Sequence, residues 1–162
     1  MSFHLRRPLL AVALAATVFA IAVPTASARY EPHPAVLKPK PTLGERAAKV
    51  ALKAVGVPYQ WGGSSPAGGF DCSGLVYWAY GRLGIELPHS SYALYDLGRP
   101  VARSSMTAGD LLFFYGLGHV GIYIGRGRMV HAPHSGRLVE VVRLGNSGYG
   151  GRLVGARRIA RT

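Results

Sequence analysis

The sequence contains very little cysteine: Cys72 is the only one in 162 residues. A single cysteine excludes an internal disulfide, so an oxidising environment could not stabilise this fold through one. In an exported protein, an unpaired cysteine is either reactive or available for an intermolecular bond. The stretch GGFDCSGLVYWAY, residues 68–80, is therefore the first candidate for chemistry.

Acidic residues are also scarce, with 7 Asp and Glu against 19 Lys and Arg and a net charge of +12. In a cytoplasmic protein this excess would first indicate nucleic-acid binding. The arginines are scattered along the chain, however, and no nucleic-acid-binding motif accompanies them, so we expect no nucleic-acid partner. The charge fits an anionic extracellular surface, such as cell-wall polymers or a membrane face. It fits equally well a role in solubility alone.

The first 28 residues have the pattern of a secretory signal peptide. Two arginines at 6–7 form a positive n-region, residues 9–23 are almost wholly apolar, and the small residues at 26–28 fit a signal-peptidase site. The apolar run is short for a membrane span, which needs roughly 20 residues. We therefore expect cleavage near Arg29 and a secreted, cell-wall-associated protein. An uncleaved N-terminal membrane anchor is the alternative.

Residues 29–41 hold four prolines and predict an extended linker or loosely packed arm. The folded domain is expected over residues 42–162 and begins with helices. Thr42 and Glu45 have the spacing of a capping box, and Asp71 or Ser73 can cap the next helix. Apolar periodicity predicts helices over about residues 43–55, 72–83 and 91–97.

The pattern changes after the third predicted helix. Short β-type runs follow, separated by Gly-rich or Ser/Gly turns, at residues 110–115, 119–125, 128–133, 138–144 and 152–159. Helices first and closely spaced antiparallel strands afterwards predict an α+β domain, with the N-terminal helices packed on a five- to six-stranded antiparallel sheet.

Cys72 is expected at or just before the first turn of the second helix. A helix N-terminus carries partial positive charge and favours the thiolate, which is the nucleophilic form of cysteine. The alternative is a small buried hydrophobe, which describes most free cysteines. The Gly-rich stretch before Cys72 favours the first interpretation, because it places the thiol next to a loop rather than in mid-strand.

Histidines on two adjacent predicted strands could serve as the base that a cysteine nucleophile needs. If the hairpin turns at residues 125–127, His119 and His131 lie across from each other, and one imidazole could orient the other. A metal site competes with this interpretation, because Cys72, His119, His131 and His134 are all possible zinc ligands. Their spacing matches no common zinc pattern, so we expect no metal and no cofactor.

Six pieces of the chain follow one another in this order: GVPYQWGG (56–63), FDCSGLVYWAY (70–80), LPHSS (87–91), AGDLLFF (108–114), HVGIYIG (119–125) and MVHAP (129–133). In this order they resemble the NlpC/P60 family of papain-like cysteine peptidases of bacterial cell-wall peptides. The sequence departs from the family around the third helix, where His89 and Leu94 stand near the places of an arginine and a glutamine in many members.

The resemblance implies a papain-like fold and a set of site residues. It implies that Cys72 is the nucleophile, that His119 is the base and that His131, rather than His134, orients the base. It also implies that three further residues line the substrate site: Tyr59, Asp71 and Ser73. For Trp61 we expect ordinary core packing.

The function expected from the resemblance is secreted cysteine endopeptidase activity on the peptide stem of peptidoglycan. The family's usual bond joins D-glutamate, through its γ-carboxyl, to diaminopimelate or lysine. Two other functions stay open: a peptidoglycan-binding module without activity, and an amidase or acyltransferase acting on another acyl substrate.

Overall fold

The computed structural model describes residues 39–160. The predicted signal peptide and residues 29–38 of the predicted arm lie outside the described residues. Within residues 39–160, no helix has both the length and the apolar character needed to cross a membrane.

Three helices precede most of the strands: α1 (Leu43–Leu52), α2 (Cys72–Gly81) and α3 (Ser91–Tyr95). The predicted capping box opens α1: the Thr42 N–H donates to the Glu45 carboxylate at 2.7 Å and the Glu45 N–H donates to the Thr42 hydroxyl at 3.2 Å. This helix ends at Leu52, earlier than the predicted end at residue 55, because the chain turns after Leu52. Asp71 caps α2, as one of the two predicted alternatives.

A six-stranded antiparallel sheet follows, with the strand order β3-β8-β4-β5-β6-β7. Its strands are β3 (Arg99–Pro100), β4 (Leu111–Phe114), β5 (His119–Gly125), β6 (Arg128–His131), β7 (Glu140–Arg143) and β8 (Leu153–Arg158). The α+β prediction is confirmed, and the strand that it missed, β3, is only two residues long. A separate antiparallel pair, β1 (Ser64–Ser65) and β2 (Gly69–Phe70), lies in a stretch that was expected to be a loop.

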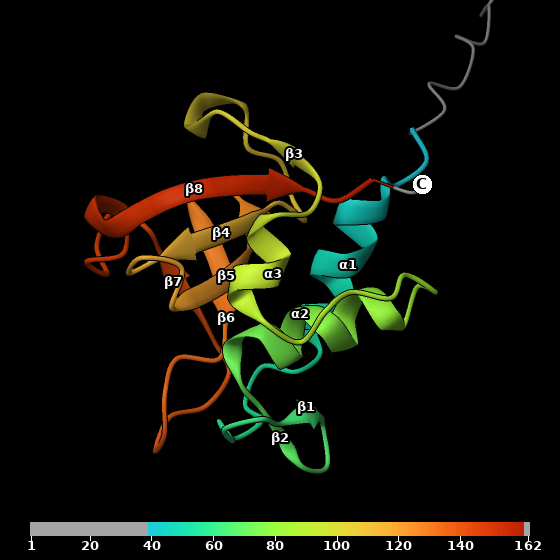
Figure 1. The fold of residues 1–162 in the computed structure, drawn as a ribbon, viewed down its shortest axis with the longest axis vertical. Coiled ribbons are helices and arrows are strands. Elements are labelled where there is room, and N and C mark those ends of the chain that lie inside the picture. The colour runs from blue at the N-terminus through green and yellow to red at the C-terminus, as the bar shows by residue number, and fades with distance from the viewer. Residues whose placement is uncertain (1–38, 161–162) are drawn as a thin grey trace, which may run out of the picture. The chain divides into compact units, whose positions relative to one another are not determined.

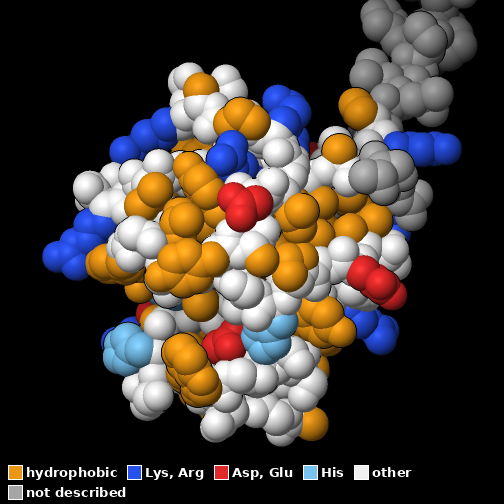
Figure 2. All heavy atoms as spheres, in the orientation of Figure 1, with side chains coloured by type: hydrophobic (Ala, Val, Ile, Leu, Met, Phe, Trp, Pro, Cys, Tyr) orange, Lys and Arg blue, Asp and Glu red, His pale blue; other side chains and the backbone are white. Residues whose placement is uncertain are grey.

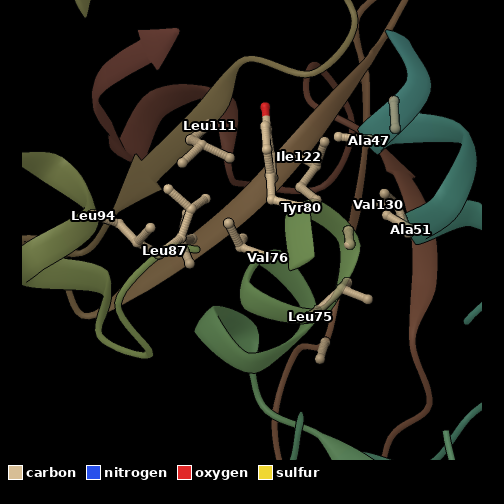
Figure 3. Close-up of a cluster of buried hydrophobic side chains, with 14 of the residues drawn as sticks. Ala47, Ala51, Leu75, Val76, Tyr80, Leu87, Leu94, Leu111, Ile122 and Val130 are labelled. Atoms are coloured by element: carbon tan, nitrogen blue, oxygen red, sulfur yellow. The ribbon is translucent and has the colours of Figure 1, made fainter. Parts of the chain in front are cut away.

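The two faces of the sheet bury different side chains, as alternation along each strand requires. The helices cover one face, where Leu111, Ile122 and Val130 from the sheet meet Leu75 and Val76 of α2 (Figures 1 and 3). The other face carries a smaller buried cluster, made by Leu112, Phe114, Tyr123, Met129, Leu144 and Ala156. The strands β4, β5 and β6 are largely buried on both faces, which explains the short apolar runs of β4 and β5 in the sequence.

The helix α2 is the most deeply packed of the three. Six of its ten residues are buried, including Tyr80, whose hydroxyl donates to the Gly109 carbonyl oxygen at 2.7 Å. At its other end, Gly74 approaches the loop before β1 so closely that a Cβ there would lie 2.0 Å from the Gly63 carbonyl oxygen. Only glycine fits at this position, so the N-terminus of α2 is held against that loop.

The basic side chains do not gather into one patch on the face shown in Figure 2, where Lys and Arg lie apart from one another around the margin. This distribution agrees with the scattered positions of arginine in the sequence.

The hydroxyl of Tyr80 is expected to contribute to stability. Tyr80→Phe should lower the free energy of unfolding by about 1–3 kcal/mol, because it leaves the buried Gly109 carbonyl without its donor. Tyr77→Phe is the matched control, since Tyr77 lies on the same helix with an exposed side chain. Urea unfolding of both variants measures the difference. Equal stabilities for the two variants would contradict this role of the Tyr80 hydroxyl.

Candidate active site

A groove of about 500 Å³ lies at the N-terminus of α2, and we call it the Cys72 groove. Its walls come from the loop before β1, the start of α2, the segment leading into α3 and the start of β5. The lining residues are Tyr59, Trp61, Gly62, Asp71, Cys72, Ser73, His89, Ser90, Ser91, Tyr92, Gly118, His119 and Pro133. The groove therefore contains the predicted nucleophile, the predicted base and the three predicted substrate-site residues.

Cys72 is the first residue of α2 and is only partly exposed. Burial raises the pKa of its thiol above the ordinary value, and the nearby Asp71 carboxylate raises it further. Backbone N–H groups of Val120, Ser73 and Cys72 itself act in the opposite direction, but they do not outweigh burial. The helix N-terminus favours the thiolate, but in the folded protein the larger effect of desolvation acts in the opposite direction.

His119 and His131 form the predicted pair. The Nε2 atom of His119 lies 2.9 Å from the Nδ1 atom of His131, and the two rings are nearly perpendicular, at 82°. Adjacent strands make the pair possible: β5 and β6 are antiparallel, and His131 lies beside Gly121, two residues from His119. The Nδ1 atom of His119 takes no part in this bond.

Both imidazoles are neutral near pH 7. Burial lowers the pKa of His119 to about 3, with smaller contributions from the charges of His131 and His134. Burial also lowers the pKa of His131 to about 4, with Arg137 and His134 contributing. The neutral state suits a base, since only a neutral imidazole can accept a proton.

Tyr149 covers the histidine pair, and no pattern in the sequence predicts this contact. Its ring stacks on His119 with centroids 5.7 Å apart and meets His131 edge-on at 5.0 Å. Tyr149 lies in the connection between β7 and β8, far from both histidines in sequence. It helps to keep water from the pair, which accounts for part of the burial that lowers both imidazole pKa values.

The Asp71 carboxylate connects three segments around the groove. It accepts from the backbone N–H of Gly62 at 2.9 Å, from the backbone N–H of Gly74 at 2.7 Å and from the Ser73 hydroxyl at 3.1 Å. His89 Nε2 lies 2.8 Å from the same carboxylate. The Asp71 carboxylate therefore has most of its acceptor sites filled by protein donors. The Ser73 hydroxyl donates its hydrogen to Asp71, and its oxygen can still accept a hydrogen bond from a molecule in the groove.

One further residue, Trp61, differs in its position from the sequence expectation. Trp61 was expected in the core, but 83% of its surface is exposed and it forms part of the groove wall, because it lies in a turn rather than in an element that packs on the sheet. Tyr92, a second exposed aromatic residue, also lines the groove. His134 is exposed and bonds to the Ser135 carbonyl, outside the histidine pair.

The lowered pKa values of the two histidines predict a pH-dependent stability. Unfolded histidine titrates near pH 6.5, so the unfolded chain binds more protons than the folded protein between about pH 6.5 and pH 3. The free energy of unfolding should therefore fall as the pH falls through this window, by about 3 kcal/mol for each of the two histidines between pH 7 and pH 4. Urea unfolding at a series of pH values measures this fall.

The double variant His119→Gln/His131→Gln isolates this effect from the titration of carboxylates. Its stability should fall less steeply with acid than that of the wild type, whereas His134→Gln, which changes an exposed histidine, should follow the wild type. An equally steep fall in the double variant would show that the pair is not responsible.

Comparison with known proteins gives a consistent result. The model of the NlpC/P60 family matches residues 56–158. A probable endopeptidase of Mycobacterium tuberculosis is 53% identical over 115 residues, which cover 69% of this chain and 30% of the relative. Murein DD-endopeptidase MepH of Escherichia coli is 41% identical over 127 residues, which cover 71% of this chain and 47% of the relative.

A solved structure of an NlpC/P60 family protein from Bacillus cereus superposes with a TM-score of 0.66 and 34% identity, covering 76% of this chain and 42% of that protein. This chain therefore spans less than half the length of these relatives. The residues matched by the family model include α2, α3, the sheet and the residues that line the Cys72 groove.

Proposed function

This chain belongs to the NlpC/P60 family, and from that premise we propose that it is a cysteine endopeptidase that hydrolyses an amide bond in the peptide stem of peptidoglycan. One observation carries the proposal: Cys72 and His119 line one groove, and His119 is hydrogen-bonded to His131 behind it. A nucleophile, a base and an orienting group in this order form the arrangement required for covalent catalysis. The names of the relatives support an endopeptidase of the cell wall.

The reaction begins from a neutral thiol and a neutral imidazole. The carbonyl carbon of the substrate approaches Cys72 Sγ, the proton passes to His119 Nδ1, and the thiolate attacks as it forms. Proton transfer coupled to attack follows from the raised thiol pKa and the lowered imidazole pKa, which disfavour a resting ion pair. His131 Nδ1 accepts the Nε2–H of His119 and so keeps its tautomer correct.

The oxyanion of the tetrahedral intermediate is stabilised by backbone N–H groups at the start of α2, where the first N–H groups lack intrahelical acceptors. The protonated His119 then gives its proton to the leaving amine, and a thioester to Cys72 remains. Water attacks the thioester with His119 again as base, and this step releases the new carboxylate and restores the thiol.

We propose that the bond joins D-glutamate, through its γ-carboxyl, to diaminopimelate or lysine. Tyr59, Asp71 and Ser73 are proposed to hold polar groups of the stem, with Asp71 acting mainly by fixing the groove wall. The Escherichia coli relative is named a DD-endopeptidase, so a cross-link bond is the alternative that the products must distinguish.

We also propose that the N-terminal signal directs the protein out of the cytoplasm. The positive net charge of the protein would then favour contact with anionic wall polymers.

Digestion of defined stem peptides, read by mass spectrometry, tests the activity. Cys72→Ala and His119→Ala should each lower kcat by at least about 1,000-fold, because the nucleophile or its base is lost. His134→Ala is the matched control and should retain activity, because this histidine is exposed and outside the pair. Cleavage between the second and third stem residues would establish the bond; binding of the peptides without cleavage would favour the binding-module alternative.

The exposed ring of Trp61 is expected to contact the substrate rather than stabilise the fold. Trp61→Ala should raise KM by about tenfold with a small effect on kcat, because the ring adds binding area at the groove wall. Trp61→Phe, which keeps an aromatic ring, should recover most of this loss. A sharply lower melting temperature in Trp61→Ala, with KM unchanged, would show that Trp61 stabilises the fold instead of contacting the substrate.

A further inference from the structure

The outer nitrogen of His131 has no visible role in the site described so far. His131 is fully buried, and its Nδ1 atom is used by His119. Its Nε2 atom is also buried and has no hydrogen-bond partner within the part of the chain that the structure describes. An unpaired buried N–H costs about 1–3 kcal/mol, so a nearby acceptor would be expected.

A carboxylate lies opposite this nitrogen. His131 on β6 and Glu140 on β7 are direct partners in the antiparallel register, and Glu140 Oε1 is 3.8 Å from His131 Nε2. A shift of about 1 Å in the glutamate side chain would bring these atoms to hydrogen-bond distance. Catalytic hydrogen bonds are often long in proteins without substrate and shorten in the complex.

The other oxygen of this carboxylate is already held in place. Arg137, in the turn between β6 and β7, donates from its Nη2 atom to Glu140 Oε2 at 2.7 Å. The ionisable groups around His131 are therefore His119 on β5, Glu140 on β7, His134 and Arg137 in the turn, and Tyr149 in the later connection. Among these groups, Glu140 supplies the carboxylate that can accept from His131 Nε2–H.

We propose that Glu140 is a positioning residue that accepts a hydrogen bond from His131 Nε2–H and thereby sets the tautomers of both histidines. The proposal rests on the proposed role of His119 as base. For His119 Nδ1 to take the proton of Cys72, its Nε2 must carry the hydrogen, and His131 Nδ1 must accept it. His131 then carries its own hydrogen on Nε2, the atom that faces Glu140.

The opposite tautomer would prevent the reaction. If His131 carried its hydrogen on Nδ1, it would donate to His119 Nε2. The hydrogen of His119 would then lie on Nδ1, and this nitrogen would have no lone pair to accept the proton of Cys72. A carboxylate beside His131 Nε2 stabilises the productive tautomer. Arg137 balances the charge of Glu140, so that His131 stays neutral instead of becoming protonated.

The test uses Glu140→Ala in the mature protein, read in two ways. The first readout is the nitrogen-15 NMR shifts of the histidine rings at neutral pH, which report tautomers without requiring substrate. Wild-type His119 and His131 should both be protonated on Nε2, and His131 should move toward the Nδ1–H form in the variant. The second readout is kcat on stem peptides, which should fall roughly 10- to 100-fold with KM nearly unchanged.

Two further variants complete the test. Glu140→Gln keeps an acceptor oxygen and should recover part of both readouts. Glu86→Ala removes an exposed carboxylate elsewhere and should match the wild type. Wild-type tautomers in Glu140→Ala would overturn the proposal. A tautomer change in a protein that cleaves no stem peptide would support the positioning role of Glu140 while rejecting the proposed function.

Discussion

The packing of α2 against the sheet is the constraint on which the whole site depends. Its apolar residues, Leu75 and Val76 among them, are buried on the helix-covered face of the sheet, and Tyr80 ties its far end to the turn before β4. In this position its N-terminus lies beside the start of β5. Core burial therefore brings Cys72 and His119 to the same groove, without a separate structural element to bring them together.

Asp71 couples this helix to its surroundings. One carboxylate receives donors from the loop before β1, from α2 itself and from His89 near α3. A movement of the groove wall would consequently move the start of α2, and Cys72 with it, because both are hydrogen-bonded to Asp71. A change in the wall that moved Asp71 would also change the hydrogen bond that caps α2 next to Cys72, so the shape of the groove and the start of the helix are linked in this fold.

Local features of the fold could be predicted from sequence, because they depend on neighbouring residues. The capping box at Thr42, the helix start at Cys72 and the alternation that brings His119 toward His131 all follow from spacing along one or two elements. The family resemblance supplied the overall fold. The residue roles in catalysis remain proposals, and the geometry described above is what supports them.

Features that depend on register or on long connections could not be predicted. Glu140 faces His131 because β7 pairs with β6 in one particular register, and a shift of one residue would turn it away. Tyr149 reaches the pair from a distant connection, and Trp61 is exposed because of the path of its turn. The raised pKa of Cys72 could not be predicted for a similar reason: the helix terminus is visible in the sequence, whereas the depth of burial is a property of the folded chain.

The raised pKa of Cys72 also bears on how long the protein can survive where oxidants are present. Oxidation of cysteine to sulfenic and higher acids follows thiolate character and exposure. A thiol that stays protonated and partly covered until a carbonyl group reaches it reacts slowly with peroxides and with other thiols. For a protein proposed to work outside the reducing cytoplasm, with no second cysteine in its sequence, the burial that raises the pKa of Cys72 also slows the oxidation of its thiol.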